Sequence, residues 1–366
     1  MSPEKNSGTG VRRLRNSGTG VPWSDPPWSD PRRRDPPYSV VSLHAHPDDE
    51  ALLTAGTLAR ACAEGHRVTL VCATDGAMGL VSASLATVGD LAELRSEELR
   101  SAAAAIGCTE VRFLGYSDSG YAAPAAHSSA EQSGKPRRIT PAPVAQQHDP
   151  VAQQHDPVAH QHDPVVHREK VSRVFSEVPV EEAAERLAAI LVEVDADVLT
   201  IYDPAGGYGH PDHIAVHDVG VAAAELAGTP VVLEATVDRR LLTRMLRVAN
   251  AVGLVRVLGV DRAEWDPRRF EDSFADPDRI THRVRVGRYA RAKRQAMAAH
   301  SSQATGDASV RTLAVFARLP LGIFRVVFAK EWFVERGRSP AGRRLDDIFD
   351  SVRMAERAHK RSGGRR

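Results

Sequence analysis

The chain has 366 residues, of which 42% are hydrophobic and 26% charged, with a formal net charge of +1. These values are typical of a globular protein with one large domain or two small ones. The nearly balanced charge gives no general attraction to nucleic acid or to an anionic membrane, so neither is expected as a partner.

The compartment expected from the sequence is the cytoplasm. No apolar run is long enough for a membrane span, and the arginine-containing start lacks the apolar stretch of a secretory signal. The chain has three cysteines and no CxxC pair. Cys62 and Cys72 lie in apolar segments, so we expect buried thiols rather than disulfides or metal ligands.

The first 37 residues are of low complexity. Residues 6–11 recur at 16–21, and the sequence Pro-Trp-Ser-Asp-Pro occurs at 22–26 and again at 27–31. Such a composition cannot bury enough apolar surface to offset the entropy of ordering. We therefore expect residues 1–37 to be disordered.

Beyond this region, strand-like and helix-like segments alternate along the chain. Strands are predicted at 40–44, 67–73, 111–114, 197–202 and 230–236. Helices are predicted between them, at 50–64, 90–106, 180–194 and 211–226. This alternation predicts βαβ units, and hence an α/β, Rossmann-like fold with a mostly parallel sheet and helices on both faces.

A repetitive insert interrupts the pattern at about 122–178. The heptad 143–149 is repeated at 150–156, almost repeated at 157–163, and decays from Pro164 onward. A proline in every copy excludes a continuous helix, so we expect a disordered, His-rich loop without catalytic importance. Its histidines could still bind metal weakly; they are His148, His155, His160, His162 and His167.

The first chemical motif is His-Ala-His-Pro-Asp-Asp-Glu at 44–50, directly after the first predicted strand. Imidazole and carboxylate groups form zinc sites, and a spare carboxylate beside a metal can act as a base. A helix cap would explain one aspartate here, but neither His46 nor the second acid. We interpret His44 as a packed histidine.

A second motif follows the fourth strand, where 202–213 contains three glycines and ends in His210-Pro-Asp-His213. It matches neither a P-loop nor GxGxxG, which argues against a nucleotide site and a Rossmann dehydrogenase. If the two strand ends converge, two histidines and one aspartate supply the three protein ligands of a catalytic zinc. A His213–His217 pair is a rival ligand set, which we rank lower because it leaves the first motif unused.

Together, His46-Pro-Asp-Asp-Glu50 and Gly209-His-Pro-Asp-His213 resemble the PIG-L/LmbE-like zinc-dependent N-deacetylase superfamily. The resemblance covers about 38–121 and 178–305, including a Lys…His-x-x-Gln segment from Lys293 to Gln303. It departs from the family pattern at Tyr121, where methionine is frequent. We expect a deacetylase domain at 38–305 and a C-terminal extension with a basic tail at 306–366.

The resemblance also implies roles for individual residues. It assigns zinc to His46, Asp49 and His213, although iron(II) would accept the same ligands. Asp48 becomes the general base for a metal-activated water, and the acetylated amide of a sugar or a related small molecule becomes the substrate. Residues that assist the reaction or contact the substrate are implied at His210, Asp212, Tyr208, Arg95 and Asp118.

The two implied substrate contacts have simpler structural interpretations. Arg95 could pair with Glu98 on a solvated helix face, and Asp118 could be a turn residue. Of the residues that assist the reaction, Asp212 is expected to orient His210 and raise its pKa, and Tyr208 is expected to move toward the oxyanion.

Two other functions stay open: an amidase of the same fold acting on larger thiol conjugates, and a non-catalytic metal-binding protein that uses the His repeats. The sequence does not fix the oligomeric state.

Overall fold

The computed structural model describes residues 37–78, 91–108, 110–120, 173–253, 265–270, 273–303 and 312–363. The low-complexity start, Tyr121 and the heptad repeats lie outside these residues. Within the described ranges, no helix combines the length and apolar character needed to cross a bilayer.

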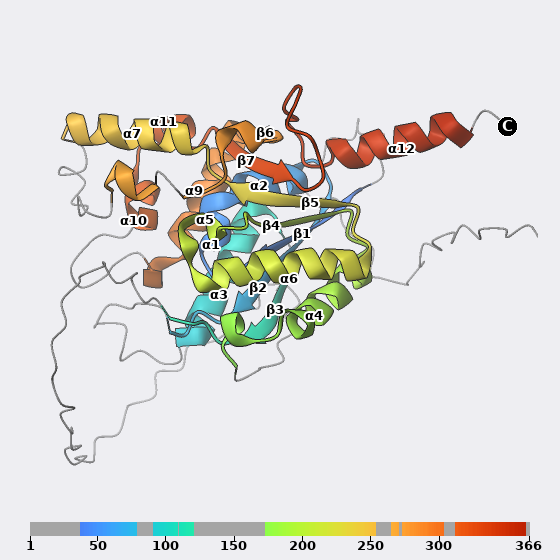
Figure 1. Cartoon of the computed structure of the whole chain (residues 1–366). Helices are drawn as coiled ribbons and strands as arrows, with labels where there is room; N and C mark the ends of the chain where they lie inside the picture. Colours follow the sequence, from blue (N-terminus) through green and yellow to red (C-terminus); the bar gives the residue numbers. More distant parts are fainter. Residues whose placement is uncertain are drawn as a thin grey trace, which may run out of the picture.

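A seven-stranded mixed sheet forms the centre of the protein, in the order β3-β2-β1-β4-β5-β7-β6 (Figure 1). The first five strands run parallel, while β7 is antiparallel to β5 and to β6. The chain winds outward from β1 to β3 and then returns to place β4 on the other side of β1. This confirms the predicted α/β fold. The strands are β1 (Ser39–His44), β2 (Arg67–Thr74), β3 (Glu110–Tyr116), β4 (Val198–Tyr202), β5 (Val231–Thr236), β6 (His282–Arg285) and β7 (Lys330–Glu335).

Helices cover both faces of this sheet, as expected for strands that are buried on both sides. One face packs on α2 (Ala55–Ala63), α3 (Leu91–Ile106), α9 (Ala290–Ala299) and α11 (Leu321–Val327). The other packs on α4 (Val180–Glu193) and α6 (Pro211–Ala227), which lie side by side (Figure 1). The remaining helices are α1 (Asp49–Leu53), α5 (Gly206–Gly209), α7 (Arg239–Ala251), α10 (Thr312–Arg318) and α12 (Asp350–Gly363).

The cores on the two faces are separate and apolar. Val40 and Leu70 point to the side of α2 and α3, whereas Val41 and Val71 point to the side of α4 and α6. This alternation follows from the two-residue period of a strand. The cysteines are free and buried in the described structure, which confirms the expectation for Cys62 and Cys72.

The helix predicted at 50–64 is broken at Thr54 into α1 and α2. Side chains from distant elements satisfy the backbone at the break. The Glu331 carboxylate of β7 accepts hydrogen bonds from the backbone N–H groups of Gly56 (2.9 Å) and Thr57 (2.7 Å). Lys293 of α9 donates to the Leu52 carbonyl at 2.7 Å. The local sequence carries no sign of this break, because its cause lies more than two hundred residues away.

The residues after 305 contribute to the same sheet. β7 pairs with β5 and holds β6, so the segment that we set apart as an extension supplies an internal strand. Its last part differs from the expected basic tail, because α12 continues to Gly363 and extends away from the sheet (Figure 1).

Gly220 is where α6 meets β4. A Cβ atom at this position would lie 2.4 Å from Cγ2 of Ile201, a buried residue of β4. We expect Gly220→Ala to lower the free energy of unfolding by about 1–3 kcal/mol through overpacking. Gly322→Ala is the matched control, because no atom lies within 4 Å of its Cβ position. Denaturant unfolding of both variants measures the difference, and equal stabilities would contradict this packing argument.

Candidate metal centre and active site

The two motifs meet at the carboxyl ends of β1 and β4. These strands are direct neighbours, with Val40 opposite Val198 and Ser42 opposite Thr200. The chain reverses its winding direction between them, and open α/β sheets form their ligand crevices at such points. The strand order therefore brings the two strand ends together, which is the condition for one metal site built from both motifs.

Hydrogen bonds fix the chain immediately before the metal motif. The Ala45 N–H donates to the Tyr202 hydroxyl at 3.2 Å, and the Ala45 carbonyl accepts from the Thr74 hydroxyl at 2.9 Å. His44 is buried, with Nδ1 3.0 Å from the Tyr202 hydroxyl and Nε2 3.1 Å from the Thr54 hydroxyl. His44 is therefore a packed residue that supports the loop.

Asp48 has an unusual backbone conformation. Its φ of 138° lies in a region that residues with a Cβ rarely adopt, at a cost of about 1–3 kcal/mol. The Glu50 carboxylate accepts the Asp48 N–H at 3.1 Å and so helps to hold this conformation. Such strain is common where a side chain must be aimed at a reacting group.

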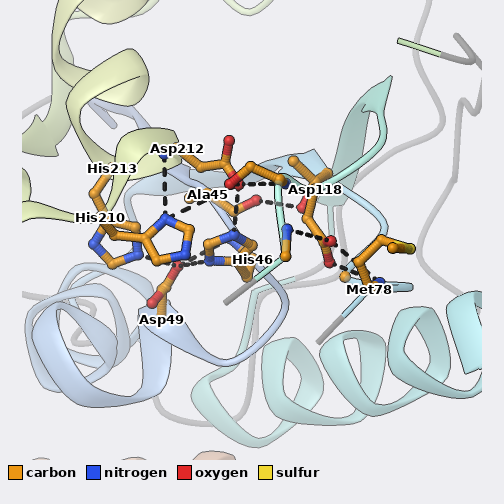
Figure 2. Close-up of polar contacts among 12 residues, drawn as sticks. Ala45, His46, Asp49, Met78, Asp118, His210, Asp212 and His213 are labelled. Carbon is orange, nitrogen blue, oxygen red and sulfur yellow. Dashed lines mark hydrogen bonds and ion pairs between the residues drawn. The ribbon is translucent and has the colours of Figure 1, made fainter. Parts of the chain in front are cut away.

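His46, Asp49 and His213 bring three potential ligand atoms within 4.8 Å of one another. One carboxylate oxygen of Asp49 lies 3.3 Å from His46 Nδ1 and 3.3 Å from His213 Nε2. The buried Nε2 of His213 has no hydrogen-bond partner among the described residues, which is expected of an atom that coordinates a cation. The donor set of two imidazoles and one carboxylate fits a divalent transition metal. Figure 2 shows these side chains pointing toward one another.

Asp212 serves His46 rather than His210, contrary to the expectation from the sequence. Its Oδ2 atom accepts from His46 Nε2 at 3.1 Å and from both the N–H and the hydroxyl of Ser119 at 2.9 Å (Figure 2). His46 can therefore use Nδ1 for a metal while Nε2 is fixed by a carboxylate, the usual support of a metal-binding histidine. The same contact creates a second potential ligand group of His46, His210 and Asp212.

His210 begins α6 as its N-cap, with Nδ1 accepting the Asp212 N–H at 3.2 Å. This contact leaves Nε2 to carry the hydrogen of the neutral ring. Burial and the neighbouring His46 and His213 lower the pKa of His210 to about 4. Asp212 does act to raise this pKa, as expected, but burial and the two histidines outweigh it, and the Asp212 carboxylate lies 4.0 Å from Nδ1 of His210.

The two aspartates of the first motif have pKa values that are shifted in opposite directions. Burial and the adjacent Asp49 raise the pKa of Asp48 to about 7. Asp49 is buried as well, but His213 and His46 hold its pKa well below the usual range. Burial opposes charge on His46, yet hydrogen bonds to Asp212 and Asp49 raise its pKa to about 10. Asp49 is thus kept anionic, as a metal ligand must be, while Asp48 can take up a proton near neutrality.

A cavity adjoins Asp49 and His213 and contains about 380 Å³ of empty space, part of it open solvent. Apolar side chains form much of its wall, namely Leu52, Leu53, Ala235 and Phe274. Tyr208 also lines it, with its half-exposed ring 5.0 Å from the His213 ring. The backbone of Gly207, at φ 69°, brings the chain under Phe274, so Tyr208 lies on a loop that only glycine can form easily.

Asp118 and Arg95 are both buried, and Asp118 lies on the other side of His46 from His213 (Figure 2). The Asp118 carboxylate accepts from the N–H groups of Met78 (3.1 Å) and Gly120 (3.2 Å), and burial raises its pKa. Arg95 donates to the carbonyl of Gly76. Both side chains therefore tie down the loops after β2 and β3, and substrate contact remains a prediction for each.

His217 lies one turn beyond His213, but the structure does not bring it into either ligand group. It is buried, and its Nδ1 atom lies 3.2 Å from the Tyr202 carbonyl. The reasoning from sequence missed Ser119 and Tyr202, which hold Asp212 and Ala45. Ser119 lies in the Asp-Ser-Gly motif after β3, a position that could have indicated its role.

With this geometry in place, comparison with known proteins identifies the family. The profile of the family "GlcNAc-PI de-N-acetylase" matches residues 41–224, which is half of the chain. A 1D-myo-inositol 2-acetamido-2-deoxy-alpha-D-glucopyranoside deacetylase from Saccharomonospora viridis is 32% identical over 85% of this chain and 99% of its own length. The chain belongs to the GlcNAc-PI de-N-acetylase (PIG-L) family.

A second relative agrees with this PIG-L assignment. The enzyme of the same name from Thermobifida fusca is 31% identical, over 83% of this chain and 96% of its own length. Among solved structures, the N,N'-diacetylchitobiose deacetylase from Pyrococcus horikoshii is 18% identical with a TM-score of 0.42, over 82% of this chain and 84% of that one.

The two rival ligand sets can be separated by metal analysis. We expect His213→Ala to purify with little metal, because it removes one of three protein ligands. His217→Gln should retain about as much metal as the unmodified chain, since His217 belongs to neither ligand group and its Nδ1 atom lies near the Tyr202 carbonyl and the Glu234 carboxylate. Elemental analysis of both purified variants checks this. Loss of metal from both variants would instead support the His213–His217 pair.

The contact between Asp212 and His46 leads to a second prediction. Asp212→Asn keeps the size of the side chain but weakens the carboxylate contact to His46 Nε2, and we expect metal affinity to fall about 10–100-fold. Competition with a chromophoric chelator measures the affinity. An unchanged affinity would show that Asp212 does not support the ligand. Asp118→Asn is the control, because the Asp118 carboxylate accepts hydrogen bonds from the backbone N–H groups of Met78 and Gly120 and belongs to neither ligand group.

Proposed function

We propose that this protein is a zinc-dependent N-deacetylase that hydrolyses the acetamide of an amino sugar. The observation that carries the proposal is one cluster in which His46, Asp49 and His213 can hold a cation beside a second, separately tuned carboxylate, Asp48. A metal site without catalysis would not require that extra acid in a strained conformation. The family assignment supports the same reaction.

The two aspartates of the first motif have different roles in the proposed reaction. Zinc, when bound, lowers the pKa of water and polarises a carbonyl oxygen. Asp48 then accepts the proton of the attacking water, for which a pKa of about 7 is well matched. Asp49 has two histidine neighbours that keep it anionic, so it remains a ligand while Asp48 changes its protonation state.

The second motif supplies a neutral donor. His210 presents Nε2–H because its Nδ1 atom accepts a backbone N–H, and its low pKa keeps the ring uncharged before reaction. This hydrogen can stabilise the oxygen that becomes negative as the carbonyl is attacked. Tyr208, which lines the cavity, would add a second donor to the same oxygen. Protonated Asp48 can then pass its proton to the leaving amine.

The substrate class follows from the relatives and from the cavity. The named relatives act on N-acetylglucosamine joined to inositol, so this compound is the first one to test. The apolar wall formed by Leu52, Leu53 and Phe274 suits the methyl group of an acetyl amide. We propose zinc because nitrogen and carboxylate ligands in a three-residue set favour it, with iron(II) as the alternative. The buried free thiols fit a cytoplasmic enzyme.

Asp48→Asn tests the proposed base. Asparagine tolerates positive φ as aspartate does, so the backbone conformation should persist. We expect kcat for acetate release to fall by about 10²–10⁴-fold while the metal content stays unchanged. Chelator-treated enzyme should be inactive and should recover with added zinc. Near-normal turnover by a zinc-loaded Asp48→Asn protein would rule out this base.

A further inference from the structure

α1 carries the metal ligand Asp49 and starts directly after Asp48, but it is only five residues long. So short a helix is not stable by itself, and its geometry must come from packing. α9 packs along it and contacts both of its ends. At one end Lys293 donates to the Leu52 carbonyl, and at the other His300 contacts Glu50.

The contact between His300 and Glu50 is short and fully buried. His300 Nε2 lies 2.7 Å from Glu50 Oε1, and neither side chain is exposed. The other oxygen of the same carboxylate, Oε2, accepts the N–H of Asp48 at 3.1 Å. One carboxylate therefore joins the end of α9 to the strained peptide of the proposed base.

His300 is itself held from a third element. It follows the last residue of α9, and the next two residues begin a 3₁₀ turn, Ser301–Gln303. The buried Glu98 of α3 accepts from the N–H of Ser302 at 2.7 Å, from its hydroxyl at 2.6 Å and from the Ser301 hydroxyl at 2.8 Å. These bonds fix the backbone of the two residues that follow His300. They therefore restrict movement of the His300 ring if the Glu50 carboxylate rotates.

We propose that His300 is a positioning residue, which orients Glu50 so that this carboxylate fixes the backbone of Asp48 and aims its side chain. The inference rests on the proposed role of Asp48 as base. Among the described residues, His300 belongs to neither potential ligand group and does not line the cavity. Its charge acts on Asp48, but its hydrogen bond is to Glu50, so we expect its effect on the orientation of Asp48 to pass through Glu50. A carboxylate without a donor on Oε1 can rotate, and the Asp48 peptide then loses its partner.

Kinetics of His300 variants test the proposal. We expect His300→Ala to lower kcat about 10–100-fold, the range for residues that orient catalytic-site groups. KM should change by less than about threefold, because substrate contacts are untouched. His300→Gln should recover most of kcat, since its amide can still donate to Glu50. A loss in KM alone, or no rescue by glutamine in a protein of normal stability, would overturn the proposal.

A double-variant cycle tests the route through Glu50. Glu50→Gln can keep only one of the two contacts, to His300 or to Asp48. If His300 acts through Glu50, the Glu50→Gln/His300→Ala protein should be no slower than the slower single variant, because residues acting as a unit are not additive. Multiplicative losses would show that His300 acts by another route.

Hydrogen exchange provides a readout that does not need activity. The peptide containing residues 46–52 should exchange faster in His300→Ala than in the unmodified chain, and His300→Gln should restore its protection. Unchanged exchange in His300→Ala would overturn the proposal, whether or not the protein deacetylates sugars. Changed exchange in a chain without deacetylase activity would uphold the positioning of Asp48 and reject the proposed function.

One control separates positioning from general stability. Ala296→Gly weakens α9 at a buried position without touching Glu50. It should leave kcat within about twofold of the unmodified enzyme. A decrease in kcat that followed the loss of Tm equally in all variants would mean a merely structural role.

Discussion

The adjacency of β1 and β4 is the constraint on which the site depends. Each strand ends in a short polar segment that alone can form only a helix cap with a nearby histidine. Because the two strands pair in register from Val40 to Ser42, the segments lie next to each other at the point where the chain changes its winding direction. Tyr202 strengthens this arrangement, since its hydroxyl contacts both the Ala45 N–H and His44.

Removing the carboxylates of this cluster from water costs free energy, and their contacts to histidine offset that cost. Asp49 and Asp212 are buried, and each would be strongly destabilised without a partner. His46 lies between them and contacts both, so one imidazole compensates two carboxylates. A bound dication would replace the positive charge that His46 supplies here, which makes metal binding release a proton. Within the described residues, the Asp48 carboxylate has no such hydrogen-bonded partner, and burial and the adjacent Asp49 raise its pKa.

Much of this could be predicted from the sequence, because the relevant signals are local. The alternation of apolar segments predicted five parallel strands, and polar residues after the first and fourth indicated where ligands gather. β6 and β7 escaped detection because their sequences, HRVR and KEWFVE, carry charges that hide the strand pattern. The sequence also did not reveal the contacts of the Asp212 side chain: proximity in sequence pointed to His210, whereas folding brings the carboxylate to His46 and Ser119.

The break in the helix at Thr54 could not be predicted from the local sequence, because the residues that contact it lie far along the chain. The family profile ends at residue 224, yet Lys293, His300 and Glu331 lie beyond it and hold α1 and the start of α2. Each uses a side chain to replace a helical hydrogen bond or to fix an acid of the first motif. A ligand-bearing helix of five residues cannot supply this rigidity from its own sequence. The C-terminal part of the chain therefore supports the first motif, because its side chains contact Glu50 and the backbone of α1 and α2.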